Sequence, residues 1–241
     1  MSTTTTAKDI NSPSYEIENE LADKFFNLGE YEEAFKLWVH SANDGSLVGK
    51  YNLARCYLKG LGVQVDIEKA FKLLYVCANS KMADAQFDLA EMYFNGIGTS
   101  VDKEKAYKWY KISAENNHML AQFKIGLSYF RGDGFEKDYN KAFYYINKAS
   151  NQGLPMAQYL LAKMYMGAIG CEYNLDKAKN LLVKAARNGE QDAYQMLISL
   201  KEQEEKEKRF EQEFKSKLEN SKKNTFDEFI KMLEKESRKN G

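Results

Sequence analysis

A segment of 36 residues recurs four times along the middle of this 241-residue chain. The stretch "YLKGLGVQVDIEKAF" begins at Tyr57, and related stretches begin at Tyr93, Tyr129 and Tyr165. A fixed period of this length is typical of a solenoid, in which each unit buries its apolar face only against its neighbours. The repeat therefore predicts one extended array of similar units.

The glycines of this stretch do not indicate a nucleotide site. Gly60 and Gly62 have a spacing found in some phosphate-binding loops, but such a loop occurs once per site and follows a strand. The positions that keep the 36-residue step instead form a repeat signature, which consists of Tyr57, Gly62, Ala70, Tyr93, Gly98, Ala106, Tyr129, Gly134, Ala142, Tyr165, Gly170 and Ala178. We interpret these residues as architecture.

Each unit is predicted to be a pair of helices, which we call helix A and helix B. In the second unit, Ala85, Leu89 and Tyr93 follow the spacing of one helix face. Helix A is expected to stop before the loop that contains Gly98, since glycine takes a positive φ without a Cβ clash. Asp102 then stands where its carboxylate can cap helix B.

The combined pattern resembles the Sel1-like repeat, a relative of the tetratricopeptide repeat with a longer loop inside the unit. The resemblance rests on the recurring alanine, leucine and tyrosine of helix A, the two loop glycines, and the aspartate and lysine–alanine pair of helix B, and it covers about residues 46–189. Two positions depart from it, because Ala168 replaces a loop glycine and Gly126 replaces a helix A alanine. The resemblance implies an all-α fold, a right-handed α/α superhelical solenoid.

The repeat boundaries divide the chain into four predicted parts. Residues 1–14 are expected to be a disordered N-terminus, and residues 15–45 a tetratricopeptide-like pair of helices that caps the array. Residues 46–200 are expected to hold the four repeats and a final half repeat. Residues 201–241 are expected to be a charged helical segment.

The C-terminal segment leaves two alternatives open. Phe210, Phe214 and Leu218 form a thin apolar stripe on an otherwise charged helix. This helix either packs on the last repeat or pairs with another chain. Farther on, Thr225 and Glu228 have capping-box spacing, which suggests either a second terminal helix or a docking motif for a partner.

Charge and length exclude several classes of partner. Lysine and arginine total 35, as do aspartate and glutamate, so no global basic field is expected to attract nucleic acid or an anionic membrane. No run of about 18 apolar residues predicts a membrane span, and the first residues do not read as a secretory signal. We therefore expect a cytoplasmic protein.

Neither the cysteines nor the histidines have the spacing of a metal or catalytic site. A bridge between Cys56 and Cys77 is geometrically conceivable, but we favour buried thiols for both, and Cys171 has no obvious partner. His40 and His118 occupy non-equivalent positions of different units and are interpreted as surface or structural residues. With no catalytic motif, the sequence predicts no metal, no cofactor and no enzymatic activity.

The candidate binding residues lie on helix A, which lines the concave side of tetratricopeptide-like solenoids. Two apolar columns are predicted there, formed by Tyr51, Leu58, Phe87, Phe94, Phe123, Phe130, Tyr159 and Met166. A variable column lies between them, formed by Arg55, Glu91, Leu127 and Lys163. We expect these columns to bind a peptide or helix of a partner protein. The alternative is that the apolar residues pack between successive A helices.

The function expected from these features is that of a non-catalytic adaptor or scaffold. Self-assembly through the C-terminal helices is the alternative. A more remote alternative comes from the resemblance, since secreted cysteine-rich members of the family have been linked to β-lactam binding or hydrolysis. Those members have paired cysteines in each repeat, whereas this chain has three cysteines in all.

Overall fold

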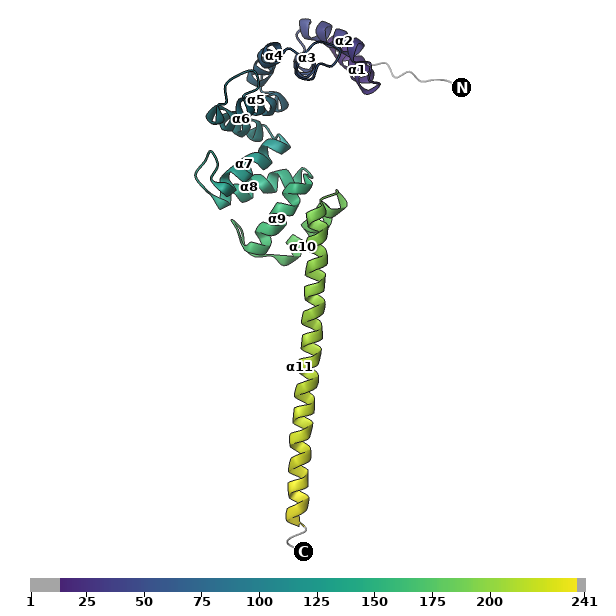
Figure 1. Cartoon of the computed structure of the whole chain (residues 1–241), viewed down its shortest axis with the longest axis vertical. Helices are drawn as coiled ribbons and strands as arrows, with labels where there is room; N and C mark the ends of the chain where they lie inside the picture. The colour runs from purple at the N-terminus through teal and green to yellow at the C-terminus, as the bar shows by residue number, and fades with distance from the viewer. Residues whose placement is uncertain (1–13, 238–241) are drawn as a thin grey trace, which may run out of the picture.

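A computed structural model describes residues 14–237, with side chains for residues 15–223 and for Lys231. Within this range every regular element is a helix: α1 (Ser14–Asn27), α2 (Tyr31–Asn43), α3 (Leu47–Lys59), α4 (Ile67–Asn79), α5 (Ala83–Asn95), α6 (Lys103–Glu115), α7 (Met119–Arg131), α8 (Tyr139–Asn151), α9 (Pro155–Gly167), α10 (Leu175–Arg187) and α11 (Gln191–Ser237). The helix pairs follow one another along a curved path, and α11 extends from the far end as a single long helix (Figure 1). The expected all-α solenoid is confirmed.

The helix B of each repeat begins directly after the residue that the sequence assigns to its cap. The side-chain oxygen of the cap accepts a hydrogen bond from the backbone N–H three residues later, at 2.9–3.0 Å in Asp66, Asp102, Asp138 and Asn174. The N–H of the same residue donates to the carbonyl of the signature tyrosine, as from Asp102 to Tyr93 at 2.9 Å. These two bonds close the long loop between helix A and helix B.

Helix A ends at a residue in the left-handed region. Gly60, Gly96 and Gly132 occupy this position with φ of 69°, 70° and 83°. Ala168 takes the same conformation in the fourth repeat, with φ 50°. The geometry of the loop is therefore kept where the glycine is lost, at the cost of strain that a Cβ brings there.

Alanines let the helices approach closely along the whole array. They are fully buried in two columns, formed by Ala70, Ala106, Ala142 and Ala178 on helix B and by Ala85, Ala121, Ala157 and Ala193 on helix A. Larger side chains such as Leu89 and Ile125 fill the space beside them. Gly126 stands in the third repeat where the other repeats have a buried alanine. A Cβ on Gly126 would lie 2.6 Å from Cγ1 of Ile146, so glycine makes room for that side chain.

Successive units are joined by a close backbone approach. A Cβ added to Gly62 would lie 2.2 Å from the carbonyl oxygen of Tyr31, the first residue of α2. At Gly170 the corresponding distance is 2.1 Å, to the carbonyl oxygen of Tyr139 at the start of α8. At these two junctions the loop lies directly on the first turn of the preceding helix B, and only glycine fits there. At Gly98 and Gly134 an added Cβ would first meet a side chain, that of Ile67 or Tyr107.

The N-terminal pair α1 and α2 is held to the array by buried hydrogen bonds. Asn19 of α1 donates to Oγ of Ser46 at 2.9 Å and accepts from Oγ of Ser41 at 2.8 Å. Ser46 also caps α3, whose Gly49 N–H donates to its hydroxyl at 3.1 Å. The predicted disordered N-terminus lies outside the described residues except for Ser14, with which α1 begins.

The C-terminal segment is one continuous helix. Met196, Leu197 and Leu200 pack on the last helix pair, and beyond them α11 leaves the array (Figure 1). The suggestion that a second terminal helix starts near Thr225 is wrong, because α11 runs through this position without interruption. No glycine or proline interrupts the sequence of α11, so nothing there breaks the helix. No helix in the described range is long and apolar enough to cross a membrane.

The cysteines are free, as the sequence favours. Cys56 and Cys77 are buried, and Cys171 is half-buried. Burial raises the pKa of the Cys56 thiol to about 11 and also raises that of Cys77. Both thiols stay protonated at neutral pH and act as small apolar side chains.

The glycine contact between units gives a stability test. Gly170→Ala should lower the free energy of unfolding by at least ~1 kcal/mol more than Gly153→Ala, measured by urea denaturation. Both positions have a positive φ, of 65° and 96°, but an added Cβ meets backbone only at Gly170 and nothing within 4 Å at Gly153. Equal losses would show that the approach does not constrain the array.

Candidate protein-binding face

Helices α3, α5, α7 and α9 are the A helices of the four repeats, and we call the surface formed by them the A-helix face. All eight residues of the two predicted apolar columns lie on these helices, half-buried and packed against the core. Each therefore has one side in the core and another at the surface. The core side of each residue packs as the second interpretation expects, and partner binding at the surface side stays a prediction.

The column that contains Phe87 connects neighbouring A helices. Phe87 stacks on His118 with 4.5 Å between ring centroids, and His118 caps α7 by accepting at Nδ1 from the Ala121 N–H at 3.1 Å. In the preceding unit, Tyr51 donates from its hydroxyl to the Asp88 carboxylate at 2.9 Å. Burial raises the pKa of both Tyr51 and Asp88. Packing between units is thus the main role of this column.

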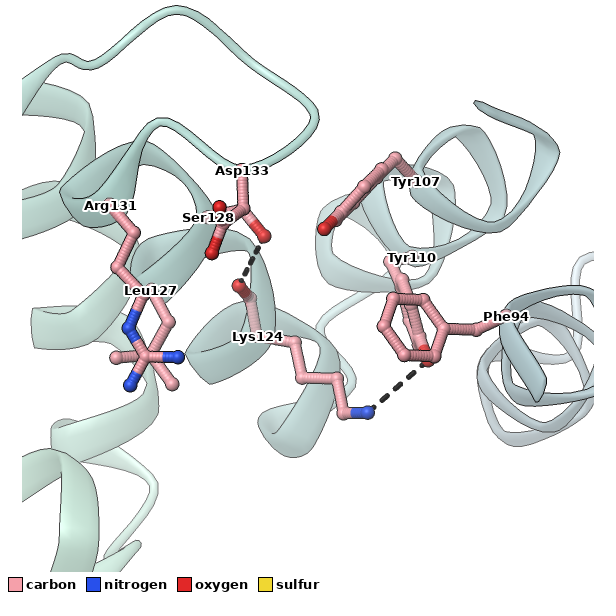
Figure 2. A pocket seen from close by; sticks show the side chains of 8 residues that line it. All are labelled: Phe94, Tyr107, Tyr110, Lys124, Leu127, Ser128, Arg131 and Asp133. Carbon is pink, nitrogen blue, oxygen red and sulfur yellow. Dashed lines mark hydrogen bonds between the residues drawn. The ribbon is translucent and has the colours of Figure 1, made fainter. Parts of the chain in front are cut away.

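In the other column, Phe94 lines an open pocket, whereas Leu58, Phe130 and Met166 are not part of its lining. The pocket has a volume of about 190 Å³ and lies where α5, α6 and α7 meet (Figure 2). It is lined by Phe94, Tyr107, Tyr110, Lys124, Leu127, Ser128, Arg131 and Asp133. The aromatic rings come from α5 and α6, whereas the two cations come from α7.

Lys124 is the electrostatic centre of this pocket. Its ammonium forms an ion pair with Glu91, lies 3.2 Å from the Tyr110 hydroxyl and stands 5.5 Å from the centroid of the Phe94 ring. Tyr110 donates its own proton to Glu91 at 2.5 Å. Burial and the Glu91 carboxylate together raise the pKa of Tyr110, so this hydroxyl remains a donor at neutral pH.

A second hollow lies between α3 and α5 and is richer in charge. Its volume is about 470 Å³, and its lining consists of Tyr51, Arg55, Leu58, Lys59, Asp84, Asp88, Glu91, Met92 and Ile97. Glu91 has neighbours in both hollows and separates them. Arg55 and Glu91 of the predicted variable column thus line this hollow, whereas Leu127 of the same column lines the pocket around Lys124.

The predicted binding residues of the third and fourth repeats that lie outside the pocket make simple local contacts. Lys163 is exposed, with its ammonium 5.3 Å from the ring centroid of Tyr159. Met166 packs in the small core cluster at the C-terminal end of the array. In the third repeat, Phe130 contacts Tyr139 edge to face at 5.5 Å. The structure does not bring these residues into the pocket around Lys124.

Sequence reasoning missed several residues of the pocket. Tyr107 and Tyr110 belong to helix B, whereas the predicted columns lie on helix A alone. Lys124 is on helix A but follows Phe123 directly, so it belongs to none of the predicted columns. The repeat itself could have pointed to Tyr107, because the equivalent position of another unit also holds an aromatic residue. Phe71 occupies the equivalent position and packs on a signature tyrosine, Tyr93, at 5.6 Å. Tyr107 instead lies 6.3 Å from the Phe94 ring, beside the pocket.

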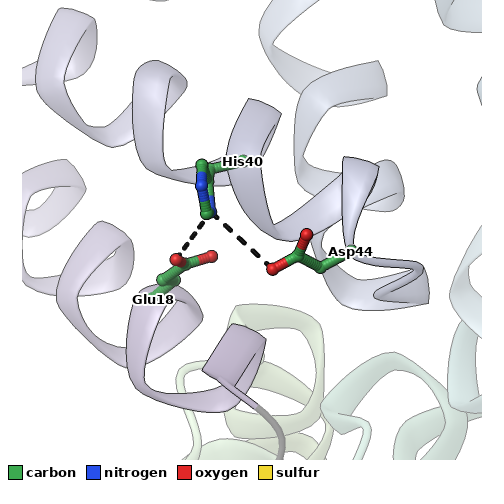
Figure 3. Close-up of side chains that lie close together, drawn as sticks. All are labelled: Glu18, His40 and Asp44. Atoms are coloured by element: carbon green, nitrogen blue, oxygen red, sulfur yellow. Dashed lines mark ion pairs between the residues drawn. The ribbon is translucent and has the colours of Figure 1, made fainter.

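A separate cluster of charged side chains lies at the N-terminal pair. His40 of α2 approaches the carboxylates of Glu18 and Asp44 with its Nδ1 atom, at 2.7 and 3.8 Å (Figure 3). No sequence pattern indicates this cluster, because Glu18 comes from a different helix. Both carboxylates approach the same nitrogen, so the Nδ1–H donates toward them and the contacts become ion pairs when the imidazole is protonated. The hydrogen bond from Glu18 raises the pKa of His40.

Four segments of the chain match the family model of the Sel1 repeat, at residues 48–75, 83–118, 120–154 and 155–190. Together they cover more than half of the sequence, and they coincide with the helix pairs described above. The chain belongs to the Sel1 repeat family. Proteins of this family are commonly protein-interaction scaffolds. A search of curated protein sequences returned no similar protein.

Solved structures with similar folds include other Sel1 repeat proteins. A Sel1 repeat protein from Oxalobacter formigenes is 31% identical, with a TM-score of 0.69, over 70% of this chain and 49% of that one. The protective antigen c5321 of uropathogenic Escherichia coli is 26% identical, with a TM-score of 0.68, over 76% and 40%. This chain therefore spans half or less of the length of these two relatives.

The two histidines give a prediction for pH. NMR titration should place the pKa of His40 above 6.5, because of Glu18, and that of His118 below 6.5, because of burial. The stabilising contribution of His40 is complete below pH 6.5 and is lost as pH rises through its raised pKa. That of His118 is present above pH 6.5 and is lost as pH falls through its lowered pKa. His40→Gln and His118→Gln assign the signals, and midpoints on the same side of 6.5 would contradict this geometry.

The ion pair in the pocket gives a second prediction. A double-mutant cycle with Glu91→Gln and Lys124→Met should yield a coupling of about 0.5–1 kcal/mol in urea denaturation, since both side chains are half-buried and share Tyr110. The exposed pair Lys108–Glu104, at 2.7 Å, is the matched control and should couple more weakly. A coupling at the pocket no larger than that of the control would rule out an organising role for Lys124.

Proposed function

We propose that this Sel1 repeat protein is a non-catalytic adaptor that binds a peptide or helix of a partner protein in a concave groove on its A-helix face. The pocket lined by Phe94, Tyr107 and Tyr110 is the observation that carries the proposal. Its volume of about 190 Å³ suits one large side chain of a peptide and is small for a drug-sized ligand. An apolar anchor of a bound peptide or helix that enters a pocket is one recognised way in which helical grooves bind their partners.

The charges around the pocket favour a peptide of mixed character. Arg131 is exposed on the pocket lining, and Lys124 lies deeper beside the aromatic rings. On the other side of Glu91, the hollow between α3 and α5 carries Asp84 and Asp88. A bound segment with an apolar anchor, an acidic residue toward Arg131 and a basic residue toward Asp84 would complement this surface.

The chemistry of the pocket supports binding rather than catalysis. Two of its titratable side chains, Lys124 and Tyr110, bind each other and the neighbouring Glu91 through an ion pair and hydrogen bonds. A catalytic site would instead present a nucleophile activated by a neighbouring base. The three free cysteines also differ from the paired cysteines of the β-lactam-binding branch, and they suit the reducing cytoplasm in which we expect the protein to act.

The test is affinity capture from extract of the native cell, with Phe94→Ser and Arg131→Glu compared with the unmodified chain. Specific partners should be lost with both variants, because the first removes an aromatic wall and the second reverses a rim charge. Tyr144→Ser is the matched control, since Tyr144 is an exposed aromatic residue on α8. Circular dichroism and thermal melting establish that each variant is folded.

The outcome separates the A-helix face from the rest of the molecule. If the same partners bind the folded Phe94→Ser and Arg131→Glu proteins as strongly as the unmodified chain, the pocket is not the binding site. Loss of partners with Tyr144→Ser alone would move the site to the helix B surface.

A further inference from the structure

Helix α11 carries an apolar stripe that the described part of the array does not cover. Phe210 is 70% exposed, Phe214 60% and Leu218 47%. The two phenylalanine rings stack on each other at 6.4 Å. The stripe begins ten residues beyond Leu200, about 15 Å farther along the helix, where α11 has left the array (Figure 1). The array itself therefore does not bury these rings.

The residues around the two phenylalanines follow the spacing of a coiled-coil seam. Steps of four and three residues alternate along one line of α11, and we call this line the α11 seam. The α11 seam consists of Gln203, Glu207, Phe210, Phe214, Lys217 and Ser221. The seam has a midpoint between Phe210 and Phe214. Glu207 and Lys217 lie at equal distances on either side of this midpoint, and so do the polar residues Gln203 and Ser221.

We propose that the α11 seam is the interface between two copies of this chain, paired in antiparallel orientation about the midpoint of the seam. In this orientation Phe210 faces Phe214 of the partner subunit, and Glu207 faces Lys217 of the partner subunit. Two aromatic layers are then flanked on both sides by layers of opposite charge. The polar layers of Gln203 and Ser221 close the interface.

Charge decides between the two possible orientations. A parallel pair in register would place Glu207 against Glu207 of the partner subunit and Lys217 against Lys217 of the partner subunit. Both layers would be repulsive, whereas both are attractive in the antiparallel pair. Glu211 and Glu213 lie close to the midpoint and approach their own counterparts in the antiparallel pair, so we expect a weak dimer.

The antiparallel pair also keeps the two arrays apart. Each array lies at one end of the paired helices. Two linked binding faces would give a dimer higher avidity for a partner that carries two copies of the bound segment. The dimer itself does not depend on the function proposed for that face.

The test is sedimentation velocity of the full chain over a concentration series from micromolar to submillimolar. The unmodified chain should dimerise with increasing concentration, and Phe210→Ser/Phe214→Ser should remain monomeric. Glu207→Lys alone and Lys217→Glu alone should each weaken dimerisation by about tenfold, since either change makes two layers repulsive. The double variant Glu207→Lys/Lys217→Glu should recover the unmodified dissociation constant to within about threefold, because the opposite charges face each other again.

Charge reversals away from the seam are the matched controls. Lys208→Glu and Glu219→Lys change exposed residues of the same helix, and they should leave dimerisation nearly unchanged. An unmodified chain that stays monomeric throughout, or a dimer that persists in Phe210→Ser/Phe214→Ser, would overturn the proposal. If the phenylalanine variant abolishes the dimer but the double charge variant fails to recover it, the antiparallel register is wrong. Circular dichroism shows whether α11 remains helical in each variant.

Discussion

The arrangement of the array depends on the close approach of a loop glycine to the helix before it. At Gly62 and Gly170 a Cβ would lie about 2 Å from a backbone carbonyl oxygen, so side chains are excluded and backbone meets backbone. Each loop is closed by the cap of the following helix B, which donates to the signature tyrosine. The loop is therefore a rigid spacer, and at these two junctions it sets the position of one unit relative to the previous one.

This spacing explains why the A-helix face has regular columns. Once each unit is placed in the same way, residues 36 positions apart come to lie beside one another on neighbouring helices. The fully buried alanines keep the helices close, and the half-buried aromatic residues such as Phe87 bridge from one A helix to the next. Surface features then arise where a unit departs from the repeat.

The third unit is the clearest departure. A Cβ at Gly134 would meet the ring of Tyr107 at 2.2 Å rather than a backbone carbonyl, and Phe135 lies 5.6 Å from Tyr107 and 4.7 Å from Tyr129. Tyr107 is thereby held at the edge of the pocket, next to Phe94. The pocket and the charged pair of Glu91 and Lys124 both occur at this junction, so repeated positions build the scaffold and variable positions supply the chemistry.

The sequence by itself determined the helix pairs, their boundaries and the family. Asp102, Gly96 and Ala106 act through local geometry, such as a cap, a positive φ or a small buried side chain, and local geometry repeats with the sequence. Only the tertiary structure decided which surface residues meet. The contacts of Lys124 with Glu91 and of His40 with Glu18 join different helices, and their partners depend on how one helix is rotated against the next. The periodic pattern shows which face of a helix is buried, but it does not show which exposed side chains of two packed helices come into contact.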